Sequence, residues 1–208
     1  MSGSRPPLAV GFPAVADRRA RVVVLGSLPG QKSLEMGQYY AQPQNAFWKI
    51  MGRLFGAHAA LPYEQRLERL RAHGVAVWDV LAAAERPGSL DSAIVASSVV
   101  INDFGAFFAR HRGIGLLCFN GNKAADLYRR RVLPTLAPRF AALEARLLPS
   151  TSPAYAALTF ERKLARWSAA LAAPVTGRDR ASAGSALRER RPAEVEPRLR
   201  AEDQKRSV

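Results

Sequence analysis

The fold of this chain is limited most by four short apolar runs, each separated from the next by segments with helical spacing. The first run, Arg21–Gly26, is rich in β-branched residues and ends in glycine, which is typical of a strand buried on both faces. The other three runs are Val75–Leu81, Gly115–Phe119 and Leu143–Leu148. Because strands that alternate with helices pair in parallel through right-handed crossovers, we expect an α/β protein, a three-layer α/β/α sandwich.

Helices are indicated where apolar residues recur every three or four positions, and those segments bound a single domain. The Pro- and Gly-rich residues 1–19 have no such period and predict a flexible N-terminal arm. Residues 174–208 are charged and rich in Ala, Ser and Pro, which predicts a disordered basic tail. One domain over residues 20–173 remains. The expected helices span residues 45–55, 63–73, 102–111, 124–133 and 160–171.

The net charge of +14 is large for 208 residues. Residues 175–208 carry +3 of it, so the rest of the chain is itself basic at +11. Such a surplus suits a polyanionic partner, because neutralising phosphates releases condensed counterions. Basic soluble proteins without a nucleic-acid partner also exist, so charge alone leaves both alternatives open.

The single cysteine, Cys118, excludes an intramolecular disulfide, a zinc site with several thiolates and a four-cysteine iron–sulfur cluster. No apolar run approaches the ~18–20 residues that span a bilayer, and the first twenty residues lack the apolar core of a secretory signal. We therefore expect a monomer of the bacterial cytoplasm that contacts no membrane. We also expect it to need no metal or other cofactor, since no two of the three histidines have metal-ligand spacing.

Ligands of open α/β sheets bind outside the carboxyl ends of the strands. The first segment at that edge, GSLPGQKS from Gly26, resembles a phosphate-binding loop, but its spacing is wrong. Three residues rather than four separate Gly26 from Gly30, and Gln31 displaces Lys32. A nucleoside-triphosphate hydrolase is therefore disfavoured. All four segments at this edge are Gly26–Gly30, Asp79–Ser92, Asn120–Lys123 and Ser150–Ala154.

The stretch that follows the first strand carries aromatic rings and an amide. Tyr39, Tyr40, Asn45 and Phe47 lie between that strand and the next helix. A flipped nucleobase needs a ring to stack on and polar groups for its edge. Structural alternatives stand beside this interpretation, because Asn45 could cap the helix and Phe47 could belong to the core. Of two adjacent tyrosines, at most one is expected to face a given pocket.

The ordered set of motifs resembles the hypoxanthine-DNA (deoxyinosine) glycosylases, the sixth family of the uracil-DNA glycosylase superfamily. The likeness covers roughly residues 20–172. It implies a four-stranded parallel sheet and monofunctional excision, chiefly of hypoxanthine, with Asn45 matching the catalytic asparagine. The matching motifs are Gly26–Gly56, VWDVLAAAERPGSLDSAI at Val77–Ile94, FNGNKA at Phe119–Ala124 and LPSTSPAYA at Leu148–Ala156.

Two departures from other branches of that superfamily bear on the substrate. Those branches carry Asp or Asn just before the first-motif proline, where this chain has Leu28, which can neither orient nor activate water. Many also begin the second motif with His or Asn, whereas Leu148–Pro153 contains neither. Both departures agree with the sixth family and disfavour strong uracil excision.

Breaking an N-glycosidic bond builds positive charge on the sugar and negative charge on the base. We expect the Asn45 carbonyl oxygen to orient a water beneath the sugar by proximity rather than basicity. Asn120 could donate to the departing base or cap the next helix, and both roles stay open. The expected base-binding residues are Phe47, Tyr40, Tyr39 and Asn120, with the backbone of Gly26, Ser27 and Leu28.

The remaining candidates concern the DNA strand. A lysine near DNA more often contacts phosphate than forms a Schiff base, so no strand-cleaving lyase activity is expected from Lys32, Lys49 or Lys123. Pro153 and Ala154 could fill the space that the flipped base leaves. The expected DNA-binding residues are Pro29, Gly30, Ser150, Thr151, Ser152, Pro153 and Lys123.

Two carboxylates follow the second strand. Asp79 is interpreted as holding a loop, with Arg86 as a partner, in preference to a catalytic role, and Asp91 as initiating a turn. The sequence as a whole predicts a DNA glycosylase that binds DNA containing deaminated bases and releases hypoxanthine from deoxyinosine. The alternatives are a glycosylase for uracil or xanthine, a nucleic-acid-binding module with a decayed site, and a small-molecule nucleotide hydrolase.

Overall fold

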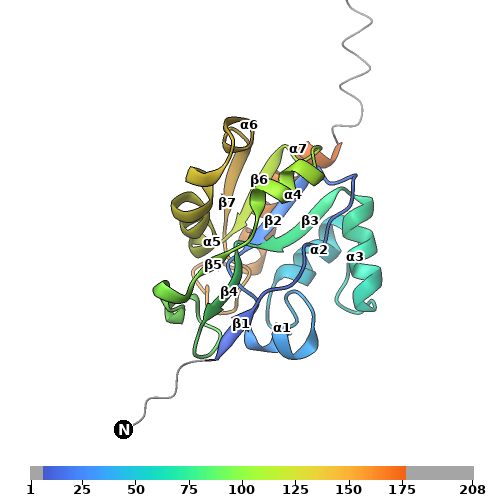
Figure 1. Ribbon diagram of the computed structural model, residues 1–208. Coiled ribbons are helices and arrows are strands. Elements are labelled where there is room, and N and C mark those ends of the chain that lie inside the picture. The colour runs from blue at the N-terminus through green and yellow to red at the C-terminus, as the bar shows by residue number, and fades with distance from the viewer. Residues whose placement is uncertain (1–6, 177–208) are drawn as a thin grey trace, which may run out of the picture. The chain divides into compact units, whose positions relative to one another are not determined.

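The computed structural model describes residues 7–176 of the chain, and its centre is a four-stranded parallel sheet (Figure 1). The strands are β2 (Val22–Gly26), β3 (Val75–Asp79), β6 (Leu116–Asn120) and β7 (Glu144–Leu148), in the order β3-β2-β6-β7. All three pairings are parallel. The four-stranded parallel sheet expected from the sequence is therefore confirmed, and each run forms a strand within two residues of the expected bounds.

Helices cover both faces of this sheet, which makes the three-layer sandwich. On one face α2 (Phe47–Phe55) packs on α7 (Phe160–Thr176), and α3 (Tyr63–Ala72) lies beside α2. On the other face lies α4 (Phe104–Arg110) (Figure 1). There Phe104 contacts Trp78 of β3, and Tyr128 contacts Phe119 of β6. The shorter elements are α1 (Gln31–Met36), α5 (Asn122–Leu127), its π-helical continuation (Tyr128–Val132), a 3-10 turn (Leu133–Thr135) and α6 (Pro138–Ala141).

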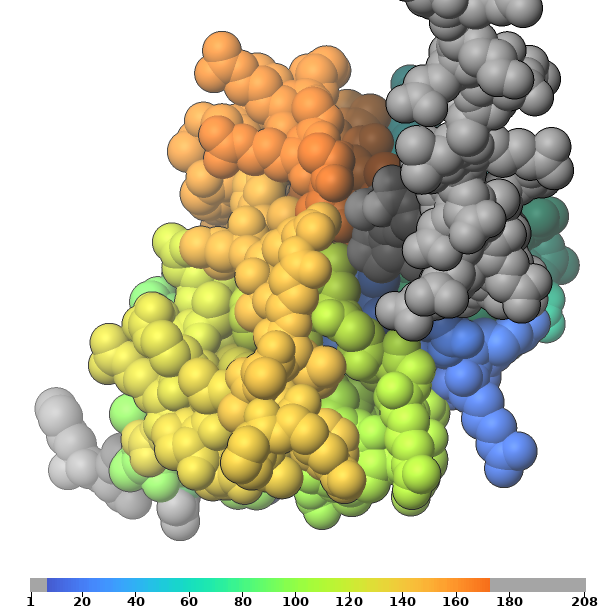
Figure 2. Space-filling model, turned by 90° about the horizontal axis from the view of Figure 1, so that it is seen from above, coloured from blue at the N-terminus to red at the C-terminus, as the bar shows by residue number. Residues whose placement is uncertain are grey.

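Burial differs between the two edge strands of the parallel sheet. Every residue of the central strand β2 and of β3, at one edge, is buried, whereas β7, at the other edge, is buried only at Leu148. The continuous apolar character of Val22–Gly26 thus reflects helices on both sides. α7 packs along β7, and the chain from α6 to α7 forms a continuous side of the molecule (Figure 2).

A second, antiparallel sheet was not expected. It consists of β1 (Leu8–Val10), β4 (Leu81–Glu85) and β5 (Val100–Ile101), in the order β1-β4-β5. A single residue, Val80, separates the end of β3 in the parallel sheet from the start of β4 in the antiparallel sheet. The chain then returns to β5 through two 3-10 turns, Asp91–Ala93 and Ala96–Ser98.

The described part of the expected N-terminal arm, residues 7–19, lies against the domain. β1 pairs with β4, and Val15 forms a bridge with Val77. The indole of Trp78 donates to the Phe12 carbonyl oxygen at 3.2 Å. These bonds differ from the expectation of a flexible arm, because the segment supplies hydrogen-bond partners that β4 and Trp78 require. Residues 1–6 and most of the expected tail, 177–208, lie outside the described residues.

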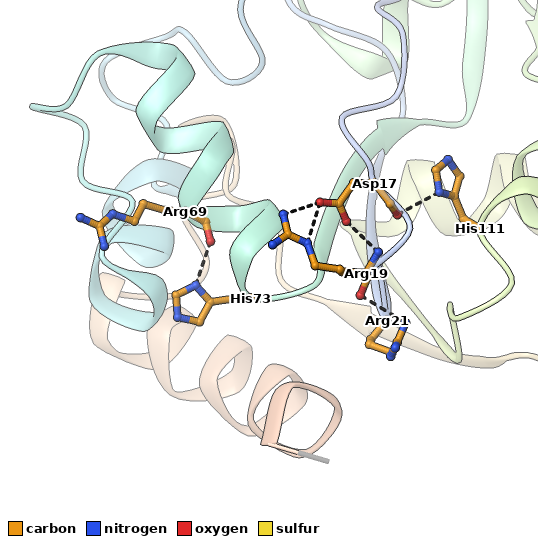
Figure 3. Close-up of polar contacts among 6 residues, drawn as sticks. All are labelled: Asp17, Arg19, Arg21, Arg69, His73 and His111. Carbon is orange, nitrogen blue, oxygen red and sulfur yellow. Dashed lines mark hydrogen bonds and ion pairs between the residues drawn. The ribbon is translucent and has the colours of Figure 1, made fainter. Parts of the chain in front are cut away.

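The amino ends of the strands are closed by polar contacts (Figure 3). The Asp17 carboxylate accepts hydrogen bonds from the backbone and guanidinium of Arg19. The His111 ring lies 3.0 Å from the Asp17 carbonyl oxygen, and the His73 ring lies 2.8 Å from that of Arg69. A carbonyl oxygen only accepts, so each ring nitrogen here carries the hydrogen. Two of the three histidines therefore have structural partners far from the carboxyl edge.

Within residues 7–176, no helix is both long enough and apolar enough to cross a membrane.

Replacement of Trp167 by alanine should destabilise the domain by about 3–5 kcal/mol, as expected when a large buried side chain is removed. Trp167 is fully buried on α7, touches Phe47 and donates to the Pro149 carbonyl oxygen at 3.0 Å. Urea unfolding measures the change. Arg162→Ala, on the exposed side of the same helix, is the control and should stay within about 0.5 kcal/mol. Equal losses in both variants would contradict the packing described here.

Candidate active site

A cavity of about 680 Å³ opens at the carboxyl ends of the parallel strands. This volume lies in the ordinary range for small-molecule pockets and exceeds what a single nucleobase fills. All four segments expected at this edge contribute to its lining. The contributions are Gly26–Gly30, Asp79 with Ser89–Asp91, Asn120–Asn122 and Ser150–Tyr155, joined by Tyr40, Gln42 and Asn45.

Arg86 fixes the loop that follows β2. Its guanidinium is buried and donates to the carbonyl oxygens of Leu28, Pro29 and Gly88. Asp91 lies 4.0 Å from the same guanidinium and accepts a hydrogen bond of 2.6 Å from the Ser27 hydroxyl. Arg86 therefore affects Asp79, its expected partner, through charge alone among the described residues, because carbonyl oxygens and Asp91 take the hydrogen bonds and the ion pair of the arginine. Asp91 also ties two loops together instead of merely starting a turn.

Asn45 lies at the cavity and also shapes the start of α2. Its side-chain oxygen accepts a hydrogen bond from the Phe47 backbone N–H at 3.0 Å, and its backbone N–H donates to the Gln42 carbonyl oxygen. The N-cap of α2 is Ala46, so Asn45 is not the cap residue itself, but the Phe47 bond lets Asn45 support the start of the helix and line the cavity at the same time. An amide oxygen has two lone pairs, so one remains while the Phe47 bond fixes the direction of the amide.

The three aromatic candidates occupy different places. Phe47 is fully buried and does not line the cavity; its ring stacks on that of Tyr40 at a centroid distance of 3.9 Å. Tyr39 also lines the cavity, but its hydroxyl is directed to the Phe12 carbonyl oxygen, on the side of the core. Phe47 as a direct base-stacking residue is therefore corrected, because Trp48 and Trp167 enclose its other sides. Tyr40 is the ring that these contacts hold at the cavity.

Asn120 and Thr151 form a reciprocal pair. The Asn120 amide donates to the Thr151 hydroxyl at 2.8 Å, and its oxygen accepts from the Thr151 backbone N–H at 2.8 Å. The Thr151 carbonyl oxygen in turn accepts from the Ala46 N–H. Thr151 is 1% exposed, so its expected contact with DNA is corrected to an internal role. Asn120 does not cap α5, whose N-cap is Gly121.

Two glycines leave room that the site needs. A Cβ atom on Gly26 would lie 2.3 Å from Asp79 Oδ1, so only glycine lets that carboxyl group approach β2. Gly121 has a φ of +96°, and a Cβ atom there would lie 2.9 Å from Cβ of Ser150. Glycine at position 121 therefore allows the loop after β7 to close on the end of β6.

The Asp79 side chain lies at the cavity, whereas the sequence favoured a loop-holding role for it. It lines the cavity and is only 3% exposed, and its Oδ2 atom has no hydrogen-bond partner among the described residues. Burial raises the pKa of the Asp79 carboxyl to about 8, with a further rise from Asp91 and an opposing effect of Arg86. The signal in the sequence was its position, the last residue of a buried strand.

Basic side chains surround the cavity. Lys32 and Arg166 line it, and Lys123 lines a smaller hollow of about 230 Å³ together with Arg130 and Arg131. Lys163 is buried and donates to the Tyr155 carbonyl oxygen at 2.7 Å, which holds the loop after β7. Among residues 7–176, no group of three or more His, Cys, Asp or Glu side chains could hold a metal ion.

Comparison with known proteins gives concordant results. Residues 12–172 match the family described as the uracil DNA glycosylase superfamily. A hypoxanthine DNA glycosylase of Methanosarcina acetivorans is 37% identical over 60% of this chain and 84% of its own length. Its counterpart in Methanosarcina barkeri is 36% identical over 56% of this chain and 73% of its own length.

A solved structure resembles the fold as a whole. It is a solution NMR structure of a Methanosarcina acetivorans protein provisionally assigned as a uracil DNA glycosylase. The TM-score is 0.66 at 34% sequence identity, and the match covers 79% of this chain and 97% of that one.

The buried carboxyl of Asp79 should make stability depend on pH. A group whose folded pKa is raised binds its proton more tightly in the folded state, so it stabilises at low pH and this contribution is lost as pH rises. Relative to Asp79→Asn, the wild type should lose stability from about pH 4 to about pH 8 and then level off. Thermal unfolding of both proteins at pH 5 and pH 8.5 measures this, and a pH-independent difference would refute the buried neutral carboxyl.

Proposed function

The chain belongs to the uracil DNA glycosylase superfamily, and on that premise we propose that it hydrolyses deoxyinosine in DNA and releases hypoxanthine. The observation that carries the choice of base is the name of the two relatives, both hypoxanthine DNA glycosylases, at 37% and 36% identity. The position of Asn45 at a cavity large enough for a nucleoside supports the reaction type.

In this proposal Asn45 orients the attacking water. The bond from the Phe47 N–H holds the amide oxygen in one orientation, so its second lone pair can accept from a water beneath the sugar. The breaking glycosidic bond has an oxocarbenium-like centre, which needs a well-placed nucleophile more than a strong one. Asn45 therefore acts by orientation, without a proton of its own to exchange.

The base occupies the space between Tyr40 and the loop after β2. Tyr40 is supported from behind by Phe47, so it can present a rigid ring to the base at low entropic cost. Asn120 donates one amide hydrogen to Thr151 and directs the other toward the Tyr40 hydroxyl, from which the departing base would take it. Backbone N–H groups of Gly26, Ser27 and Leu28 are the further donors in this proposal.

The DNA strand runs along the loop after β7. Ser150 and Ser152 are partly exposed, Pro153 is exposed, and all three line the cavity. Together with Pro29, Gly30 and Lys123 they would hold the extruded nucleotide through its backbone. The proposed enzyme is monofunctional: it leaves an abasic site and does not cut the strand.

Uracil is the second candidate base, because the similar solved structure carries a uracil DNA glycosylase assignment. Leu28 argues against it, since an apolar side chain stands where other branches place a polar one. Xanthine is the third candidate, and one assay separates all three.

Asn45→Ala should lower the single-turnover rate of hypoxanthine release by on the order of 100-fold or more, because the water loses its orientation. The measurement uses oligonucleotides with one deoxyinosine, deoxyuridine or deoxyxanthosine, followed by alkaline cleavage at the abasic site and gel analysis. Samples without alkali should show intact strands if the enzyme is monofunctional.

Gln65→Ala is the matched control, since it removes an exposed side-chain amide on α3, away from the cavity. Its rates should equal those of the wild type. An unchanged rate in Asn45→Ala would remove the proposed mechanism. Absence of hypoxanthine release by the wild type would remove the proposed substrate.

Affinity for DNA should fall steeply with salt, since the chain carries +14 and phosphate contacts release counterions. Fluorescence anisotropy with a deoxyinosine duplex between 50 and 200 mM NaCl measures the slope of log affinity against log salt (about −0.9 for each phosphate neutralised). Lys123→Ala should reduce the magnitude of that slope by about one, and Lys49→Ala, on the exposed side of α2, should not. A slope near zero would favour a small-molecule nucleotide hydrolase.

A further inference from the structure

The carboxyl group of Asp79 lies against the end of β2, inside the cavity. Asp79 is paired in register with Gly26, and its backbone oxygen accepts a hydrogen bond of 2.8 Å from the Asn102 amide. This bond fixes the end of β3 without using the carboxyl group. The missing side chain of Gly26 lets Asp79 Oδ1 occupy the position where a Cβ atom would otherwise lie.

Two buried polar atoms lie at this place. Asp79 Oδ2 has no hydrogen-bond partner among the described residues, and the Tyr40 hydroxyl oxygen has only the neighbouring Asn120 amide. Asn120, the amide beside the Tyr40 hydroxyl, is engaged with Thr151. A buried polar group without a partner costs free energy, so native proteins rarely keep one without a use for it. Here both atoms belong to residues that line the ligand cavity.

Burial keeps the Asp79 carboxyl neutral near neutral pH, and the charges around it modify this effect in opposite directions. Asp91 faces it from the loop after β4 and raises its pKa, while Arg86 from the same segment lowers it. Tyr39 and Tyr40 face it from the segment before α2, and burial raises the pKa of both phenols, so they stay uncharged. Arg86 is committed to three carbonyl oxygens and to Asp91, which leaves burial as the dominant effect on Asp79.

We propose that Asp79 is a catalytic general acid that donates its proton to N7 of the purine as the glycosidic bond breaks. The inference rests on the proposed function and deepens it, because it assigns the leaving-group half of the reaction to a residue other than Asn45. The Asp79 carboxyl is neutral, lines the cavity and has one oxygen without a hydrogen-bond partner among the described residues. It therefore carries a proton at the right place, on an oxygen that no described residue engages.

The Asp79 O–H bond breaks and an N7–H bond forms, while the C1′–N9 bond breaks and its electron pair moves to the base. The base leaves as neutral hypoxanthine with its hydrogen on N7. The water oriented by Asn45 adds its oxygen to C1′, and the proton it releases restores the Asp79 carboxyl. The overall reaction consumes one water and needs no other reactant.

This step distinguishes purines from pyrimidines. Hypoxanthine has a basic nitrogen at N7 on the ring that carries the glycosidic bond, so protonation there neutralises the leaving group. Uracil has only carbonyl oxygens and a protonated nitrogen outside its glycosidic nitrogen. An acid in this position therefore favours release of a deaminated purine.

The experiment compares single-turnover release from oligonucleotides that contain deoxyinosine or 7-deazadeoxyinosine, with wild type and Asp79→Asn, between pH 5.5 and pH 9.5. Wild type acting on deoxyinosine should slow tenfold per pH unit above the Asp79 pKa of about 8. Asp79→Asn should be on the order of 100-fold slower at pH 6.5 and should lack this alkaline decline, since an amide does not ionise. Wild type acting on the 7-deaza substrate should be comparably slow, and the variant should add no further loss there.

Asp103→Asn is the control, because it makes the same change at an exposed helix cap that asparagine also forms; its rates should match those of the wild type. An alkaline decline that persists in Asp79→Asn, or an equal loss on both substrates, would overturn the inference. If the variant does not fold, the wild-type rates on deoxyinosine and 7-deazadeoxyinosine still test the inference. Failure of wild type to release hypoxanthine at any pH would instead overturn the proposed function.

Discussion

Parallel pairing on both sides of β2 is the constraint on which the site depends. Because β3 and β6 run in the same direction as β2, their carboxyl ends reach the same edge, with Gly26 in register with Asp79. The loop after β2, the Asp79 carboxyl and Asn120 meet there although they lie far apart in the sequence. The pair between Asn120 and Thr151 adds the loop after β7, and Thr151 reaches Ala46, next to Asn45. Four segments thereby become one cavity.

The parallel sheet and most helices could be predicted because their signals are local. Apolar runs and helical stripes record burial directly in the sequence. The antiparallel sheet could not, because β4 reads LAAAE, with little β propensity, and forms by pairing with distant segments. The segment of residues 7–19 has no period for the same reason: its order comes from bonds to β4, Val77 and Trp78, which no local pattern records.

Within the site, the segments that form the cavity were more predictable from the sequence than the directions in which their side chains point. The edge rule and the family resemblance identified the segments that form the cavity and placed Asn45 there. Which ring faces the base depends on packing: Phe47 is enclosed by Tyr40, Trp48 and Trp167, and Thr151 is turned inward by Asn120. The role of Asp79 depends on what its neighbours do, because Arg86 is drawn to the carbonyl oxygens of another loop. Such competition between partners becomes visible only in three dimensions.

The antiparallel sheet also bears on how the chain folds. β1 pairs with β4, and Leu8 lies opposite Glu85 in this pairing. The contact therefore closes a loop that contains nearly the whole first half of the domain. During synthesis β1 leaves the ribosome long before β4 exists, with Leu8 and Val10 as apolar residues that even the finished protein leaves exposed. Because β4 follows β3 after a single residue, β1 has no strand to pair with until that part of the chain has been made. The first strand of the chain therefore depends on a partner far along the sequence, which is a contact of high order.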